Sequence, residues 1–201
     1  MSRKVGVFLK KGLFSKKGFT LAEILVVIAI VSVLMAISIP ILFHKMENTR
    51  RSVDIANARS MKSILVHSYM DGTIEFTSDK YGGNKTCMAV LVVEDGITYR
   101  ASGSVLVNGQ DWNADKGYGD YARVKKLFEN AGLSETKVLA KNTNDDGWKC
   151  YCVVLYSDGQ CRIFSSPSNL DLGGTSGGVF EQKMAEILTD EKSGIEKALG
   201  A

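Results

Sequence analysis

The sequence predicts an α+β fold in which one long N-terminal helix, transmembrane in its first half and amphipathic in its second, packs on a C-terminal antiparallel β-sheet domain. Three observations predict this fold class. Residues 24–43 are a run of 20 residues without a charge. Residues 44–69 are charged yet still compatible with a helix. The rest of the chain is glycine-rich, with short apolar runs between turn residues.

The apolar run has the length of a membrane span. As a helix, about 20 residues rising ~1.5 Å each would reach ~30 Å, the thickness of the hydrocarbon core of a bilayer. A cleaved secretory signal has a shorter apolar stretch of about 7–15 residues, followed by a small-residue cleavage site. The best candidate for such a site, residues 34–36, lies inside the run. The sequence therefore favours an anchor over a secretory signal.

Positive charge is concentrated before the apolar run. Residues 1–18 carry six lysines and arginines and no acid, whereas the whole chain has a formal net charge of +3. Such a leader predicts a cytoplasmic N-terminus and a C-terminal domain on the outer side of the membrane. Without the leader the chain is negative, which argues against general nucleic-acid binding.

One acid, Glu23, lies directly against the apolar run. A carboxylate without a partner costs about 2.5–3.5 kcal/mol in the centre of a membrane on insertion scales. A plain membrane anchor gives no reason for an acid at this position. Glu23 therefore calls for a partner, and a cation would be the most favourable one.

Residues 16–30, KKGFTLAEILVVIAI, resemble the N-terminal processing signal of type IV pilins and pseudopilins. The pattern consists of basic residues, Gly18, Phe19, Thr20, a leucine, a variable residue, Glu23 and a long apolar helix. The resemblance implies that a membrane-embedded prepilin peptidase and methyltransferase cleaves after Gly18 and N-methylates Phe19. Cleavage would create an α-amine at Phe19, which could meet Glu23 of a neighbouring subunit. Pairing within one chain stays open as the alternative.

The same resemblance implies four parts of the chain. Residues 1–18 are a leader that is removed, 19–43 a transmembrane and filament-core helix, 44–70 its amphipathic continuation, and 71–201 a variable globular α+β domain. Pro40 lies where pilins commonly carry a helix-breaking proline. Because proline in a helix interior costs about 3 kcal/mol, we expect a kink or a locally melted segment there. A hinge and a tolerated transmembrane proline are equal readings of this residue.

The function implied by the resemblance is that of a structural subunit of a type IV pilus or pilus-like filament. Its partners would be other pilin subunits, the prepilin peptidase and the inner-membrane assembly platform. It would be a single-pass membrane protein first and part of a cell-surface filament later. Two alternatives stay open. One is a pseudopilin of a type II secretion or DNA-uptake system, and the other is a minor pilin with an adhesive head, whose candidate contacts are Trp112, Tyr118 and Tyr121.

The second half of the long helix carries one apolar stripe at the helical period. The stripe comprises Met46, Val53, Ala56, Ser60, Met61 and Ile64. Seven charged side chains on the same segment are expected to form a solvated face. They are Lys45, Glu47, Arg50, Arg51, Asp54, Arg59 and Lys62. Asp71-Gly72 is expected to end the helix.

Two β-hairpins are predicted in the C-terminal domain. The first joins residues 86–93 and 97–107, and the second joins residues 148–156 and 161–165. A short amphipathic helix is expected to end at Gly132, and another near the C-terminus runs from about Phe180 to Leu188.

The even number of cysteines is compatible with two disulfides in an oxidising compartment. The candidates are Cys87, Cys150, Cys152 and Cys161. Cys150 and Cys152 should face the same side of one strand, so each is expected to seek a partner elsewhere. Four reduced, buried thiols are the alternative.

No metal site, cofactor or catalytic group is predicted. Residues 111–122 begin like a calcium loop, but a lysine and an alanine occupy the expected glycine and bidentate-acid positions. Residues 142–147 indicate a turn, and residues 173–178 a flexible connector rather than a phosphate loop. Neither histidine has an acid or cysteine at metal-ligand spacing. We therefore expect a protein that is not an enzyme.

Overall fold

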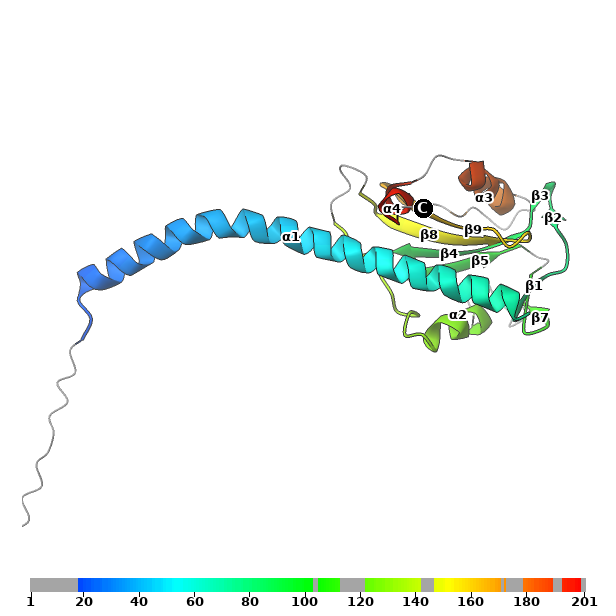
Figure 1. The fold of residues 1–201 in the computed structure, drawn as a ribbon, viewed down its shortest axis with the longest axis horizontal. Coiled ribbons are helices and arrows are strands. Elements are labelled where there is room, and N and C mark those ends of the chain that lie inside the picture. The colour runs from blue at the N-terminus through cyan, green and yellow to red at the C-terminus, as the bar shows by residue number, and fades with distance from the viewer. Residues whose placement is uncertain are drawn as a thin grey trace, which may run out of the picture. The chain divides into compact units, whose positions relative to one another are not determined.

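A computed structural model of the chain describes residues 18–102, 105–112, 122–141, 147–170, 172, 179–189 and 193–199 (Figure 1). The described helices and strands are α1 (Leu21–Met70), β1 (Ile74–Phe76), β2 (Lys80–Tyr81), β3 (Asn84–Lys85), β4 (Cys87–Val93), β5 (Gly96–Ala101), β6 (Val105–Val107), β7 (Gln110–Asp111), α2 (Ala122–Glu129), β8 (Cys150–Tyr156), β9 (Cys161–Ser166), α3 (Val179–Thr189) and α4 (Gly194–Leu199). This order confirms the predicted α+β class, with a long N-terminal helix followed by antiparallel sheets.

Several segments discussed above lie outside the described residues. They are the leader up to residue 17, Tyr118, Tyr121, most of the calcium-like loop, and residues 142–146 and 173–178. The chain divides into two compact units, Met1–Phe43 and His44–Ala201.

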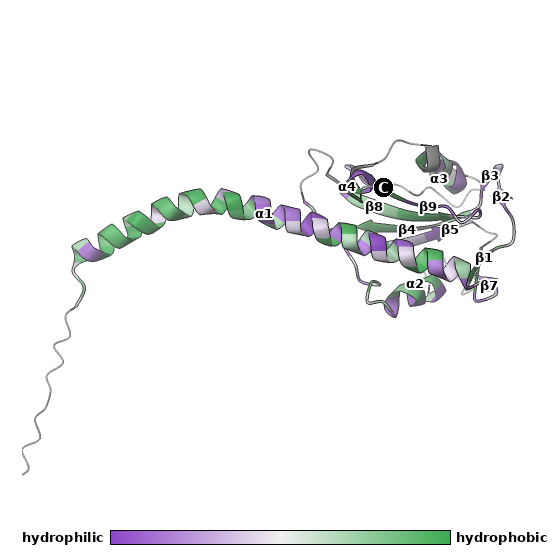
Figure 2. Ribbon diagram, viewed as in Figure 1, coloured by the Kyte–Doolittle hydropathy of each residue, from purple (hydrophilic) through white to green (hydrophobic). Residues whose placement is uncertain are grey.

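In the first unit, α1 exposes its apolar residues along the whole predicted span. Every large apolar side chain from Phe19 to Phe43 is 40–83% exposed. Figure 2 shows this part of the helix as almost uniformly hydrophobic. Its most apolar window has a mean hydropathy of 3.0 and no buried residue, and it is the one helix of the described chain with the length and composition to cross a membrane.

The polar atoms inside this span are satisfied locally. The hydroxyl of Ser32 donates to the Ile28 carbonyl at 2.7 Å, and that of Ser38 donates to the Leu34 carbonyl at 2.8 Å. Such bonds to the preceding turn remove the cost of placing a hydroxyl in an apolar medium. The helix is not interrupted at Pro40, so the structure contains no melted segment there. A kink at Pro40 stays a prediction.

The second unit is built around a four-stranded antiparallel sheet with the order β5-β4-β8-β9. Both predicted hairpins are confirmed, because β4 pairs with β5 and β8 pairs with β9. The hairpins join through β4 and β8, whose residues are almost all buried. Two central strands that are covered on both faces explain why their sequences are continuous apolar runs rather than alternating ones.

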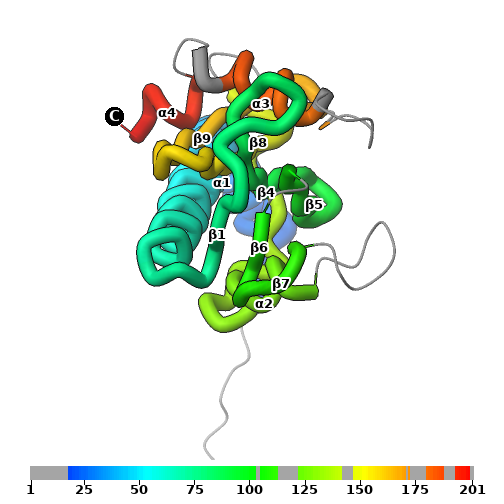
Figure 3. Tube along the Cα trace, turned by 90° about the vertical axis from the view of Figure 1, so that its right-hand side faces the viewer, coloured from blue at the N-terminus to red at the C-terminus, as the bar shows by residue number. Residues whose placement is uncertain are grey.

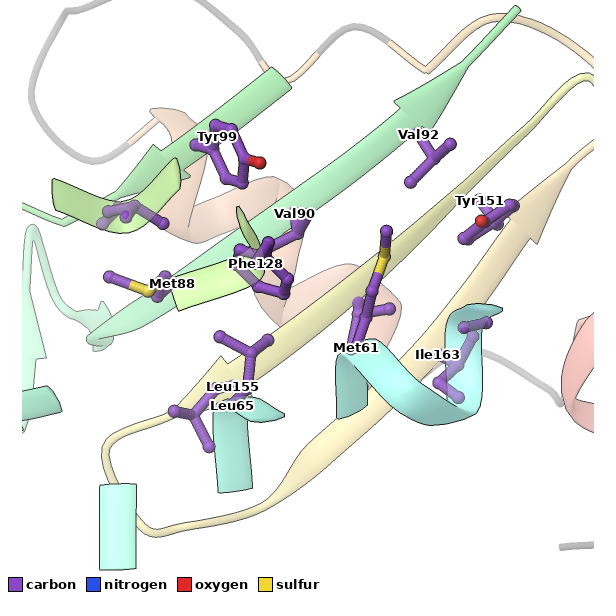
Figure 4. Close-up of a cluster of buried hydrophobic side chains, with 14 of the residues drawn as sticks. Met61, Leu65, Met88, Val90, Val92, Tyr99, Phe128, Tyr151, Leu155 and Ile163 are labelled. Carbon is purple, nitrogen blue, oxygen red and sulfur yellow. The ribbon is translucent and has the colours of Figure 1, made fainter. Parts of the chain in front are cut away.

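Helices cover both faces of this sheet (Figure 1). On one face, the second half of α1 and α2 pack against side chains such as Met88, Val90 and Leu155 (Figure 4). On the other face, α3 places Phe180 and Met184 over a second apolar cluster. The main core therefore lies between α1 and the sheet, and α3 closes the opposite side.

The face of α1 that packs on the sheet differs from the predicted stripe. The buried residues are Asp54, Ala58, Met61, Leu65 and Ser68. Their spacing of three and four residues is that of one helix face. Met46, Val53, Ala56 and Ser60 of the predicted stripe are exposed, and Met61 is the one member that is buried. The prediction was wrong because an apolar stripe does not identify the partner that covers it, and the sheet of this subunit covers a different face of α1.

The strand predicted over residues 97–107 is two strands. β5 ends at Ala101, and β6 instead pairs antiparallel with β1. A two-residue turn, Asn108-Gly109, then joins β6 to β7. Both turn residues have positive φ, 53° and 71°. This is the type I′ geometry that Asn-Gly favours, and the sequence contained this signal.

The C-terminal helix α4, which the sequence analysis did not predict, is held on β9 by an ion pair. Arg162 donates from Nε and Nη2 to the two carboxylate oxygens of Glu196, at 2.9 and 2.6 Å. A third donor, Nη1, reaches the Ile187 carbonyl at the end of α3. One guanidinium thus joins β9, α3 and α4.

Candidate functional site

The first turn of α1 is closed by a capping box between Thr20 and Glu23. The Thr20 N–H and hydroxyl both donate to Glu23 Oε2, at 2.8 and 2.9 Å, and the Glu23 N–H donates to Thr20 Oγ1 at 3.2 Å. This reciprocal arrangement satisfies backbone donors that a helix start leaves free. Sequence reasoning missed it, although Thr-x-x-Glu before an apolar run is its signature.

The capping box fixes where the Glu23 carboxylate lies. It holds the carboxylate at the N-terminal end of α1, four residues after Phe19. A carboxylate has about four acceptor sites, so two hydrogen bonds from Thr20 leave capacity for a cation. The carboxylate is exposed and retains this acceptor capacity at the start of the helix.

The residues at the predicted cleavage position are accessible and sterically unconstrained. A Cβ added to Gly18 would meet nothing within 4 Å. Phe19 is 83% exposed. The fold of the described chain thus gives no reason for a glycine at position 18. A requirement for glycine there would have to come from a protein that acts on this segment.

A second polar cluster joins α1 to the globular domain at Asp54. Its carboxylate accepts the Leu139 N–H at 2.9 and 3.2 Å, the Ala140 N–H at 2.9 Å and the Trp148 Nε1–H at 3.1 Å. The residue is fully buried. Burial raises the pKa of Asp54, against the lowering effect of the hydrogen bonds from Ala140, Leu139 and Trp148. The expectation of a solvated Asp54 was wrong.

Glu47 lies about two helical turns before Asp54 on α1 and belongs to the same junction. Its carboxylate accepts the Lys141 N–H at 2.9 Å and lies 3.6 and 3.8 Å from Arg50 and Arg51. The Arg51 guanidinium also lies over the Trp148 ring, 5.7 Å from its centroid. Two acids that lie about two turns apart on one face of α1 thus bind consecutive backbone N–H groups of the segment 139–141. We call Glu47 and Asp54 the carboxylate clamp.

The cysteines lie on two different faces of the sheet. Cys87, Cys150 and Cys152 belong to the cluster under α3, whereas Cys161 packs against the cluster under α1. That Cys150 and Cys152 share a face agrees with the prediction. The structure contains all four as free thiols. Burial raises the pKa of the thiols, that of Cys161 to about 12.

The strand register favours the alternative of reduced cysteines. Cys87 lies opposite Tyr156, so Cys152 is four residues away along β8, about 13 Å at ~3.3 Å per residue. A disulfide needs Cα atoms within about 4.4–6.8 Å. Side chains two apart on one strand, such as Cys150 and Cys152, run parallel rather than toward each other. The sheet itself separates Cys161 from the other three.

We expect all four cysteines to be thiols in the mature protein. Denatured protein treated with iodoacetamide without a reductant should gain four alkyl groups by mass spectrometry, the number of cysteines in the chain. The same sample reduced first is the control and should give the same number. Fewer alkyl groups before reduction than after it would contradict the register argument.

The candidate adhesive aromatic Trp112 belongs to the core. It is 7% exposed, and its backbone N–H donates to the Val105 carbonyl at 3.2 Å. Among the described residues no three histidine, cysteine or acidic side chains are grouped as metal ligands would be.

Comparisons with known proteins point to the N-terminal segment. Residues 13–39 match the family model of the prokaryotic N-terminal methylation motif. Over 141 residues the chain is 27% identical to a type IV major alpha-pilin of Moraxella bovis, a match that covers 68% of this chain and 85% of the relative. No solved structure is significantly similar to the chain. The motif begins before the capping box and ends one residue before Pro40.

Proposed function

Because the chain belongs to the type IV pilin family, we propose that it is a structural subunit of a type IV pilus or pilus-like filament. The observation that carries this proposal is the methylation motif at the start of a helix whose apolar surface is exposed from Phe19 to Phe43. Such a surface requires a cover in water. A bilayer supplies it before assembly, and the same segment of neighbouring subunits supplies it in the filament.

Processing of the N-terminus controls when this apolar surface leaves the bilayer and packs against neighbouring subunits. A prepilin peptidase cleaves after Gly18 and methylates the new terminal Phe19. The cationic α-amine of one subunit then pairs with Glu23 of its neighbour, at the carboxylate that the capping box holds. Before cleavage no amine exists at Phe19, so the precursor lacks one half of this contact.

The membrane arrangement follows the charge of the leader. The basic N-terminus stays in the cytoplasm, the apolar segment spans the membrane, and the globular domain lies on the outer side. The assembly platform in that membrane then adds the subunit to the filament. The family assigns a structural role to the chain rather than an enzymatic one.

A pilus subunit is favoured over a pseudopilin by one comparison. The relative is a major pilin, and the match covers 85% of its length, so the likeness extends well beyond the shared N-terminal signal. A pseudopilin of a secretion or DNA-uptake system is the second candidate, since it has the same N-terminal signal. The length of the filaments separates them, because a pilus extends far beyond the cell surface.

The variant Gly18→Ile tests the proposal without disturbing the fold, because the space around Gly18 is empty. In cells with an active prepilin peptidase, the unchanged chain should lose its leader and appear in filaments sheared from the surface. Gly18→Ile should keep the leader and form no filaments. Gly6→Ile, a matched change elsewhere in the leader, should behave as the unchanged chain does. An unchanged chain that keeps its leader would overturn the proposal.

A further inference from the structure

The strand β9 forms one edge of the four-stranded sheet, and α4 lies beside it (Figure 3). In an antiparallel sheet the N–H and C=O groups of successive residues alternate between the two sides of a strand. Every second residue of an edge strand therefore directs these groups away from the sheet, where a strand of another molecule can pair with them. The cover of this edge decides whether subunits can pair through their sheets.

Side chains at the start of α4 bind the outward groups of β9. The Ile163 N–H donates to Glu196 Oε1 at 3.3 Å, and the Ser165 N–H donates to Ser193 Oγ at 3.0 Å. The Ser193 hydroxyl in turn donates to the Ile163 carbonyl at 3.5 Å. Ile163 and Ser165 are two residues apart, as outward-facing residues of one strand must be. Side chains thus occupy the place that the backbone of a fifth strand would take.

The strand β9 also holds α4 in place. The Ile195 N–H donates to Ser165 Oγ at 3.0 Å, and the Ile195 side chain is fully buried. Burial raises the pKa of Glu196, but the hydrogen bonds from Arg162 outweigh this effect and hold the pKa below its usual value. The Glu196 carboxylate is therefore charged at neutral pH and bound to Arg162 of the strand that it covers.

We propose that α4 is an autoinhibitory cover of the β9 edge, which prevents a second copy of the chain from adding its own β9 to the sheet. The edge is complementary to itself. Two β9 strands that meet antiparallel about Ile163 place Cys161 of each copy opposite Ser165 of the other, so outward N–H groups face outward carbonyls. This contact involves no residue of the N-terminal helix, so it goes beyond the proposed function.

Glu196→Ala tests this cover in the full-length protein in detergent micelles. In dilute solution, amide hydrogen exchange at Ile163 should become about ten-fold faster than in the unchanged chain, because its N–H loses a charged acceptor. At higher concentration, sedimentation should show dimers that the unchanged chain does not form. Glu94→Ala, which removes an exposed acid from the turn between β4 and β5, is the matched control and should change neither result.

Ser165→Pro locates the contact between the copies. Its N–H points away from β8, so proline removes an outward donor at a sheet edge, where proline is tolerated. The double variant Glu196→Ala/Ser165→Pro should therefore stay monomeric at every concentration.

Ser193→Ala is a milder change that keeps the test valid if thermal unfolding shows that Glu196→Ala does not fold. It removes the acceptor of the Ser165 N–H and should speed exchange at Ser165 by about five-fold, with the ion pair intact. Three results would each overturn the proposal. They are unchanged exchange at Ile163 and Ser165 in these variants, a folded Glu196→Ala chain that stays monomeric, and dimers that persist with Ser165→Pro.

Discussion

Glu23→Gln is expected to abolish filament assembly while leaving the fold and the start of α1 intact. Glutamine at this position can still accept the hydrogen bonds from Thr20, because capping boxes use Glu or Gln. The negative charge is lost, so the α-amine of the neighbouring Phe19 has no counterion in the apolar filament core. At about 2.5–3.5 kcal/mol for an unpaired charge, the equilibrium for adding a subunit should fall about 100-fold.

The reciprocal change, Thr20→Val, separates the cap from the charge. It removes the hydroxyl that bonds Glu23 but keeps the carboxylate, and a lost cap costs about 1 kcal/mol. Filament yield, measured in the sheared surface fraction against total subunit, should therefore be reduced much less by Thr20→Val than by Glu23→Gln. Equal yields from the two variants would show that the cap, rather than the charge, is what assembly needs.

Asp54→Ala is expected to destabilise the globular domain strongly. It leaves three donors, the Leu139 and Ala140 N–H groups and the Trp148 indole, without their acceptor. Each unsatisfied buried donor costs about 1–3 kcal/mol, so we expect a loss of at least about 3 kcal/mol. In a protein of this size that lowers the Tm by roughly 6–12 °C.

Tryptophan fluorescence of the full-length protein in micelles can follow this unfolding, because both tryptophans are buried. Arg59→Ala, an exposed change on the same helix, is the control and should stay within about 0.5 kcal/mol. Asp54→Asn should lie between the two, since it keeps one oxygen. An Asp54→Ala variant as stable as Arg59→Ala would show that the carboxylate clamp does not hold α1 on the domain.

The pH dependence of stability has a defined sign at Asp54. Burial raises its pKa above the usual 3.8, so the folded state takes up a proton more readily than the unfolded state. The stabilisation from this group is fully present below the usual pKa and is lost as the pH rises through the folded-state pKa. Relative to Asp54→Asn, the unchanged chain should therefore gain stability as the pH falls toward that window.

The parts of the fold that local sequence determines could be predicted. The apolar runs at β4 and β8, with turn residues beside them, gave two correct hairpins, and Asp71-Gly72 gave the correct end of α1. Short strands such as β1 carry too few residues for a pattern. The capping box and the Asn108-Gly109 turn both have recognisable local signatures in the sequence, Thr-x-x-Glu and Asn-Gly.

The junction between α1 and the domain could not be predicted, because it depends on contacts distant in sequence. Asp54 is buried by groups 85–94 residues later in the chain. Nothing near Asp54 distinguishes it from a solvated acid. Met46 and Val53 show the opposite case, since they are apolar and yet exposed on this subunit. We expect neighbouring subunits to cover them in a filament.

The central claim is that the chain is cleaved after Gly18 and assembled through the new N-terminus. The most direct measurement is mass spectrometry of the N-terminal peptide from sheared surface filaments. The account predicts that the peptide begins at Phe19, lacks residues 1–18 and carries one additional methyl group on its α-amine. Filaments whose subunits still begin at Met1, or begin at Phe19 without the additional methyl group, would contradict it.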